Sequence, residues 1–191
     1  DVELPREWLE RMIKPLRDDP TIASVTPFTN SGTICSFPCF CEDNDLQAGL
    51  SVQEMDAYFK ELPLEIYEVP TGVGFCMAMS RAAIEAIGTF DAESFGRGYG
   101  EENDWCQRAE KAGFRNVHIS NLFVRHNHGG SFDSEEKRLL VEEHLRALNR
   151  KHPHYDEEVS NYVRRDPARP FRKMVEQHII TTSTAKSILV F

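Results

Sequence analysis

The feature that most restricts the fold is an alternation of short apolar runs with segments of helical periodicity. Strands are predicted at residues 22–27, 65–69, 74–79, 117–119 and 122–124. Helices are predicted among them at residues 6–16, 52–61, 81–87 and 102–112, and further helices follow at 134–151, 156–163 and 168–180. Because strands that alternate with helices form layered structures, we expect an α/β domain with a helical C-terminal extension.

Local signals sharpen some of these elements. Ser51 and Glu54 have the spacing of a capping box at the start of the helix over 52–61. The run 74–79 is almost wholly apolar, which predicts a central strand buried on both faces. The irregular stretch from residue 28 to 49 is rich in Asn, Asp, Cys, Ser and Pro, and loops of that length in a compact domain are usually functional or mobile.

Size and charge exclude several function classes. A chain of 191 residues buries roughly 70% of its unfolded surface, so it can carry a real core. The net charge of −9 argues against a general nucleic-acid binder. No apolar run approaches the roughly 20 residues that span a bilayer. The run 164–173 is an exception to this acidic balance, because it holds five basic residues and one acid. It fits either a solvated surface or contact with an anionic membrane surface or a polyphosphate.

The cysteines favour a reducing compartment. Cys35, Cys39 and Cys41 lie close together without the spacing of a zinc module, and the total of five is odd. Reduced thiols in a cytoplasmic protein are the expected state, and a structural metal is the alternative. Because the chain begins at Asp1 rather than Met, we expect a processed or excised piece.

The densest polar cluster spans residues 98–106, where a Gly-rich loop meets a helix. An acidic first turn is often structural, because it complements the helix dipole. Helical spacing separates its acids: Glu102 lies on the face of Cys106, whereas Asp104 meets Arg108 at i+4. We therefore expect Glu102 to face a cleft and Asp104 to form a surface ion pair. The dipole is expected to hold Glu102 ionised, which suits a general base.

A second cluster spans residues 124–132, directly after a predicted strand. Its two histidines, His126 and His128, precede a Gly-Gly pair at a strand end, where ligands gather in α/β sheets. One interpretation is a pair of surface histidines without a function, and the other is a metal or substrate site. The acids Asp1 and Glu3 are oxygen ligands of the kind that Mg²⁺ or Mn²⁺ prefers.

In this order and spacing, these pieces resemble the C-terminal part of the catalytic domain of family 2 glycosyltransferases, bacterial type, which have the GT-A fold. The matching pieces are Asp1 with residues 3–9 (ELPREWL), 25–30 (VTPFTN), 70–77 (PTGVGFCM), 87–91 (IGTFD), 98–108 (GYGEENDWCQR) and 124–132 (VRHNHGGSF). The resemblance implies a partial GT-A mixed sheet in residues 1–133 and a helical extension in 134–191. It also implies that the nucleotide-binding half precedes Asp1 and is absent, so this fragment alone is expected to be inactive.

The resemblance further implies an inverting transfer of a sugar from a nucleotide diphosphate sugar to an acceptor hydroxyl. It assigns the general base to Glu102, with Glu101 beside it and Asp104 as runner-up. Asp1 and His126 are implied ligands of Mg²⁺ or Mn²⁺, and His128 is a further candidate for that role. The residues expected to contact substrate are Thr71, Gly72, Gly74, Tyr99, Gly100 and Trp105.

The expected acceptor is a carbohydrate or a lipid-linked carbohydrate in polysaccharide synthesis. The protein is expected to act at the cytoplasmic face of the membrane and not to bind nucleic acid. We also expect a homo-oligomer formed through the sheet edge ahead of Asp1, or cover of that edge by the apolar tail 188–191. Two other functions stay open: a metal-independent carbohydrate hydrolase that uses Glu101 or Glu102 with a second carboxylate, and a non-catalytic interaction module of the same fold.

Overall fold

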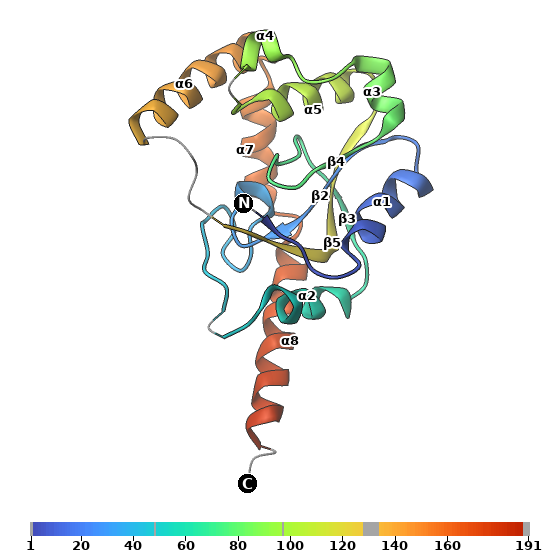
Figure 1. The fold of residues 1–191 in the computed structure, drawn as a ribbon, viewed down its shortest axis with the longest axis vertical. Helices are drawn as coiled ribbons and strands as arrows, with labels where there is room; N and C mark the ends of the chain where they lie inside the picture. Colours follow the sequence, from blue (N-terminus) through green and yellow to red (C-terminus); the bar gives the residue numbers. More distant parts are fainter. Residues whose placement is uncertain (1, 48, 97, 128–133, 189–191) are drawn as a thin grey trace.

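The computed structural model describes residues 2–47, 49–96, 98–127 and 134–188, with side chains omitted at 134–137 and 183–188. Its centre is a mixed sheet built around the long strand β5 (Arg115–His126) (Figure 1). β5 runs parallel to β2 (Ile22–Thr29) and antiparallel to β1 (Val2–Glu3) and β3 (Ile66–Glu68). β4 (Ala78–Met79) pairs with the other edge of β2. The predicted α/β class is confirmed.

The helices surround this sheet. α1 (Trp8–Asp18) and α2 (Val52–Lys60) contact β5, and α5 (Glu101–Lys111) packs near α3 (Arg81–Ile87) and α4 (Ala92–Phe95). A 3₁₀ turn, η1, occupies Thr33–Cys35, and α6 (Ser134–Lys151), α7 (Tyr155–Arg165) and α8 (Arg169–Ile188) complete the chain. The predicted capping box of Ser51 and Glu54 is confirmed at the start of α2. α4 lies outside the predicted helices.

Two predicted strand arrangements are wrong. Residues 117–119 and 122–124 belong to one strand, because Ser120 does not turn the chain. Its hydroxyl accepts from the Glu65 N–H at 2.7 Å, and a register shift in the pairing with β2 takes up the extra residues. The apolar run 74–79 is not a central strand either: only its last two residues pair, and the side chains of residues 75–79 are half-buried.

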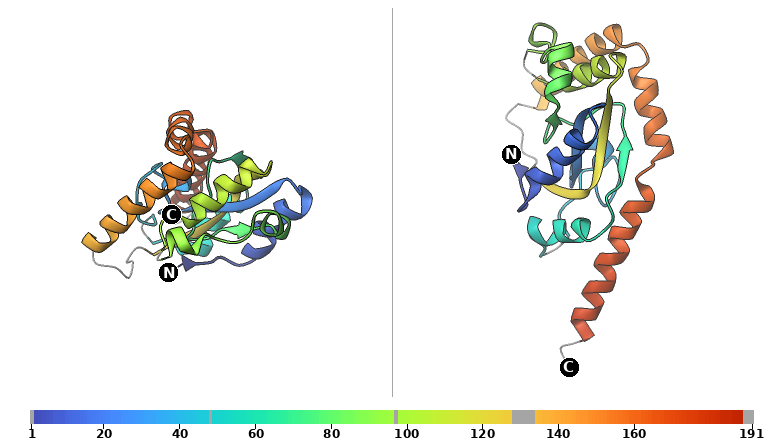
Figure 2. Two further views of the ribbon diagram at one scale, coloured as in Figure 1. Left: turned by 90° about the horizontal axis from the view of Figure 1, so that it is seen from above. Right: turned by 90° about the vertical axis from the view of Figure 1, so that its right-hand side faces the viewer.

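The C-terminal helices share the core of the first part of the chain. Phe171 of α8 is fully buried and stacks on Phe28 of β2, with ring centroids 5.6 Å apart. Val175 and Ile179 of the same helix belong to the same buried cluster as Phe59 of α2. Figure 2 shows α7 and α8 along one side of the molecule, with α8 reaching beyond the body. Helix α8 therefore shares a core with β2 and α2.

No helix among the described residues is long and apolar enough to cross a membrane.

Candidate functional site

Helix α5 fixes a loop, residues 70–74, through a row of hydrogen bonds. Gln107 donates to the Pro70 carbonyl at 3.1 Å, and Asn103 donates to the Thr71 hydroxyl at 2.8 Å. The Gly72 N–H donates to the Cys106 sulfur at 3.2 Å. Side chains on two turns of α5 therefore hold residues 70–72, directly ahead of the apolar run, against the helix. Thr71 and Gly72 are buried, so they support the loop and present no open surface to a substrate.

Glu102 lies in the first turn of α5, half-buried against this loop. A Cβ placed on Gly74 would lie 3.5 Å from the Glu102 carboxyl carbon, so the exposed backbone of Gly74 lines the carboxylate. The Gly100 N–H points at the same carboxylate at 3.4 Å. Burial, followed by the nearby charge of Glu101, raises the pKa of Glu102 above its ordinary value. Desolvation thus opposes the effect expected of the helix dipole and favours the protonated form.

Glu101 stands beside Glu102 with an unsatisfied oxygen. Its Oε2 is buried and has no hydrogen-bond partner among the described residues. A buried carboxylate oxygen without a donor is costly, and such atoms in folded proteins usually meet water, an ion or a ligand. Two adjacent carboxylates, one with an unsatisfied oxygen, therefore lie at the start of α5.

The turn ahead of α5 has an unusual backbone. Gly98, Tyr99 and Gly100 all have positive φ, at 94°, 67° and 124°. Gly100 is required there, because a Cβ would lie 3.1 Å from the Phe95 ring. His144 of α6 holds the turn from outside: its Nδ1 lies 2.6 Å from the Gly98 carbonyl and 3.1 Å from that of Tyr99, so the ring donates to both. Tyr99 is half-buried and Gly100 is buried.

Asp104 is ion-paired as predicted, but it is fully buried rather than on the surface. One of its oxygens accepts from Arg108 at 2.8 Å, and the other meets Lys151 at 2.7 Å and His152 at 2.8 Å. Burial alone raises the pKa of Asp104, but the hydrogen bonds from Lys151, His152 and Arg108 outweigh it and lower the pKa. Asp104 therefore joins α5 to the end of α6 and has no oxygen left for a base role.

Trp105, expected to contact substrate, also faces inward. Its side chain has no exposed surface, and its Nε1 donates to the Gly88 carbonyl at 2.9 Å. It packs with Ala83 and Ala109 in the cluster between α3 and α5. The structure therefore gives Trp105 a packing role in place of the substrate contact.

His126 lies at the end of β5, on the other side of the loop from Glu102. Phe75, the residue after Gly74, stacks on the His126 ring with centroids 5.3 Å apart. The His126 Nδ1 lies 2.8 Å from the Ser31 carbonyl, so the ring donates through Nδ1, and its lone pair resides on Nε2. Asn30 holds the backbone of His126 through bonds of 2.7 and 3.0 Å. The structure thus brings Glu102 and His126 to either side of Gly74 and Phe75.

The other two residues predicted to bind a metal ion, Asp1 and His128, are not among the described residues. Val2, next to Asp1 in the chain, pairs with His126. Among the described residues there is no group of three His, Cys, Asp or Glu side chains placed to hold a metal ion. The predicted metal site therefore stays a prediction.

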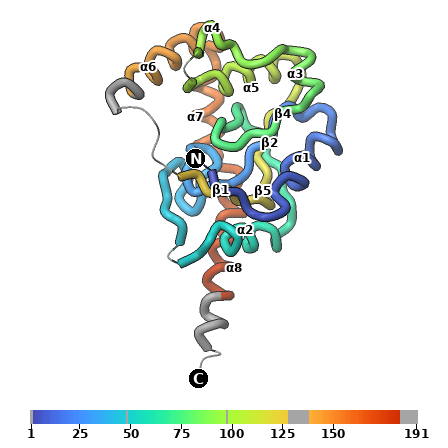
Figure 3. Tube along the Cα trace, viewed as in Figure 1, coloured from blue at the N-terminus to red at the C-terminus, as the bar shows by residue number. Residues whose placement is uncertain are grey.

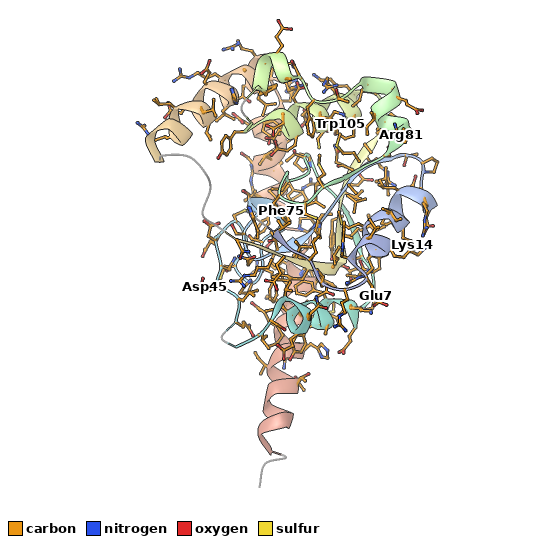
Figure 4. The ribbon with its side chains drawn as sticks, viewed as in Figure 1. Glu7, Lys14, Asp45, Phe75, Arg81 and Trp105 are labelled. Atoms are coloured by element: carbon orange, nitrogen blue, oxygen red, sulfur yellow. The ribbon has the colours of Figure 1, made fainter. Side chains whose placement is uncertain are left out.

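A polar cavity of about 340 Å³ adjoins His126, and sequence reasoning missed most of its wall. It is lined by Asn30, Asp43, Asn44, Asp45, Leu46, Arg125, His126 and Asn127. Figure 3 shows the long loop after β2 running beside the end of β5, and Figure 4 shows Asp45 at the outer edge with Phe75 nearer the centre. The polar composition of residues 28–49 signalled a functional loop, but no local pattern indicated its contact with His126.

A larger cavity, of about 510 Å³, lies between β3, α5 and α7 and holds none of the predicted site residues. Its wall includes Pro70, Glu110 and Tyr162. The cavity therefore touches the anchored loop at Pro70 and does not include Glu102 or His126 in its wall.

Comparison with known proteins adds no family. No family model matches the chain, and no curated protein matches it.

Proposed function

We propose that this chain is the acceptor-side part of an inverting glycosyltransferase with the GT-A fold, with Glu102 as its general base. The observation that carries the proposal is the placement of Glu102 and His126 on either side of Gly74 and Phe75. The resemblance stated above assigns the base and a metal ligand to these two residues, which are 24 positions apart in the chain (126 − 102). The fold brings them to one loop.

The chemistry asked of Glu102 is proton removal. As the acceptor oxygen bonds to the anomeric carbon, the bond from that carbon to the diphosphate breaks, and the hydroxyl proton passes to the Glu102 carboxylate. A base works best when its pKa approaches the working pH, and burial moves the pKa of Glu102 in that direction. Glu101 supports this role because its charge also raises the pKa of Glu102.

The proposed divalent ion, Mg²⁺ or Mn²⁺, fits the donor set that the residues offer. His126 presents the tautomer with its lone pair on Nε2, fixed by the Ser31 carbonyl, and metal-bound histidines commonly have such a second partner. Asp1 would supply the carboxylate. When bound, the ion would neutralise charge on the leaving diphosphate.

The substrate-binding residues divide by exposure. Gly74 is exposed and Tyr99 is half-buried, so these two are proposed to contact the sugars. Thr71, Gly72, Gly100 and Trp105 are buried and are proposed to position the loop and the start of α5. The proposed partners are a nucleotide diphosphate sugar and a carbohydrate or lipid-linked acceptor, in polysaccharide synthesis at the cytoplasmic face of a membrane.

Substitution of the base tests the proposal. In the full-length protein that contains this chain, Glu102→Gln should lower the transfer rate by about 10²- to 10⁴-fold, because general-base catalysis contributes that much. Donor binding, measured by calorimetry, should stay unchanged. The matched control is Glu93→Gln, an exposed acid in the first turn of α4, which should leave both quantities unchanged. A Glu102→Gln enzyme within threefold of the native rate would refute the assignment.

Metal removal separates the proposal from its alternatives. EDTA should stop transfer, and added Mn²⁺ or Mg²⁺ should restore it, with a weaker response in His126→Ala. Release of sugar to water that persists in EDTA would instead indicate a hydrolase. If the full-length protein shows no ligand-induced thermal shift with any nucleotide sugar, the chain is an interaction module.

A further inference from the structure

The basic run 164–173 crosses the junction of α7 and α8, and its basic side chains differ in exposure to solvent. Four residues, Arg164, Arg165, Arg169 and Lys173, are exposed; we call them the basic face. None of the four forms an ion pair in the part of the chain that the structure describes. The fifth basic residue, Arg172, is buried.

The one acid of the run does not neutralise this face. Asp166 pairs with Arg172 at 2.5 Å, and the Arg172 guanidinium also lies over the Phe40 ring, 4.4 Å from its centroid. Asp166 and Arg172 therefore cancel each other. The acids of α7 lie in its first turn, at the opposite end from Arg164 and Arg165. A protein of net charge −9 thus exposes, at one junction, four basic side chains that form no ion pair among the described residues, although Glu68, Glu110 and Glu158 line the same cavity as Arg164 and Arg165.

Apolar side chains accompany these charges on α8. Phe171, Val175 and Ile179 point into the core, whereas Met174 and Ile180 are 40% and 59% exposed. Arg169 and Lys173 are i and i+4 on the same helix, so they share a face, and Ile180 follows one helical repeat beyond Lys173. The exposed side of α8 therefore carries two basic residues at its start and two apolar residues further along, interspersed with the polar residues Glu176, Gln177 and Thr181.

The outline of the molecule leaves this side open. In the right-hand view of Figure 2, α7 and α8 run along one edge, while the N-terminus lies on the opposite side. Because β1 pairs with the end of β5 at His126, the proposed sugar-transfer site lies away from this edge. Contact of α7 and α8 with a broad flat surface would leave the site uncovered.

We propose that the basic face and the exposed side of α8 dock on an anionic lipid surface. Each basic residue near such a surface raises the binding constant about fivefold, so four raise it about 600-fold over a neutral bilayer. Met174 and Ile180 favour lipid over nucleic acid, because apolar side chains gain free energy at the headgroup boundary and gain none from a phosphate backbone. The proposal goes beyond sugar transfer and uses none of its residues.

Vesicle co-sedimentation of the 191-residue chain tests the docking. Vesicles of phosphatidylcholine and phosphatidylglycerol at 3:1 should bind the chain, and pure phosphatidylcholine vesicles should not. Arg169→Gln with Lys173→Gln should lower the partition coefficient about 25-fold, and Met174→Ser with Ile180→Ser about tenfold. The matched control is Arg81→Gln with Arg150→Gln, two exposed arginines of α3 and α6, which should bind as the native chain does.

Several outcomes would overturn the proposal. They are equal binding to neutral and anionic vesicles, equal losses in the control and test pairs, and tighter binding to a 20-nucleotide single strand than to anionic vesicles. Circular dichroism on every variant shows whether it is folded. Because all four substituted α8 positions are exposed, a folded variant that binds normally would also refute the docking surface.

Discussion

Replacing Asp104 with Asn probes the junction that fixes helix α5. The Asp104 carboxylate is fully buried and meets three basic side chains, from Arg108, Lys151 and His152. Asn has nearly the same shape but no charge, and it can accept through one oxygen only. The substitution therefore removes the carboxylate partner of Arg108, whereas Lys151 keeps its pair with Asp91 at 2.7 Å, and the space occupied stays constant.

The size of the effect follows from burial on each side. Breaking a fully buried ion pair costs about 3–5 kcal/mol, because one charge stays uncompensated. Here the side chains of Arg108 and Lys151 are 25% and 33% exposed, so water screens the cations that remain. We expect a loss of about 2–3 kcal/mol in the free energy of unfolding. For a chain of this size that lowers the melting temperature by about 4–12 °C.

Urea denaturation followed by circular dichroism at pH 7 measures this loss. The matched control is Asp18→Asn, which removes the carboxylate of an i,i+4 pair with Lys14 where both side chains are more than half exposed. Such surface pairs contribute less than about 0.5 kcal/mol. If Asp104→Asn costs no more than Asp18→Asn, the buried network does not stabilise the junction and the reasoning fails.

The same pair of proteins should respond to pH. The pKa of Asp104 is lowered in the folded chain, so its contribution is full above the unfolded value of about 3.9 and is lost as the pH falls through the folded value. The stability difference between native and Asp104→Asn chains should therefore be full at pH 7 and should shrink below about pH 4. A difference that grows on acidification to pH 3 would contradict this.

Two further predictions concern the core. Burial lowers the pKa of His118 to about 4, so on acidification the unfolded chain takes up a proton before the folded chain does. The free energy of unfolding should therefore fall by about 3 kcal/mol between pH 6.5 and pH 4. Urea midpoints should show this fall, and His118→Gln should reduce it. Phe171→Ala should lower the free energy of unfolding by about 3–5 kcal/mol, in a single transition. Met174→Ala, on the exposed side of α8, should lower it by less than about 1 kcal/mol. Similar losses in the two variants, or a separate early transition for α8, would contradict a shared core.

The predictability of these features depends on how far apart the partners lie in the chain. The capping box at Ser51 and the i+4 pair of Asp104 with Arg108 are local, and both are present. The further partner of Asp104, His152, is 48 residues away, so helical spacing placed the carboxylate on the surface. The division of β5 into two strands failed similarly, because the hydroxyl of Ser120 bonds to Glu65, 55 residues earlier.

The candidate site divides in the same way. Helical spacing separated Glu102 from Asp104, and the structure places them in different surroundings. The position of Phe75 on His126 and the contact of the polar loop with the end of β5 depend on tertiary packing. A sequence pattern can therefore indicate which side chains carry chemistry, whereas the walls around them require the fold.

The first turn of α5 brings these observations together. Glu102 and Asp104 are two residues apart, yet burial beside Glu101 raises the pKa of Glu102, and three basic partners lower that of Asp104. Two of those partners belong to the end of α6 and the residue after it, and His144 of α6 holds the turn before Glu101. Environments that drive neighbouring pKa values apart are how one fold separates a proton-accepting carboxylate from a structural one. The C-terminal helices thus supply the partners that lower the pKa of Asp104, which leaves Glu102 as the carboxylate that we propose accepts the proton.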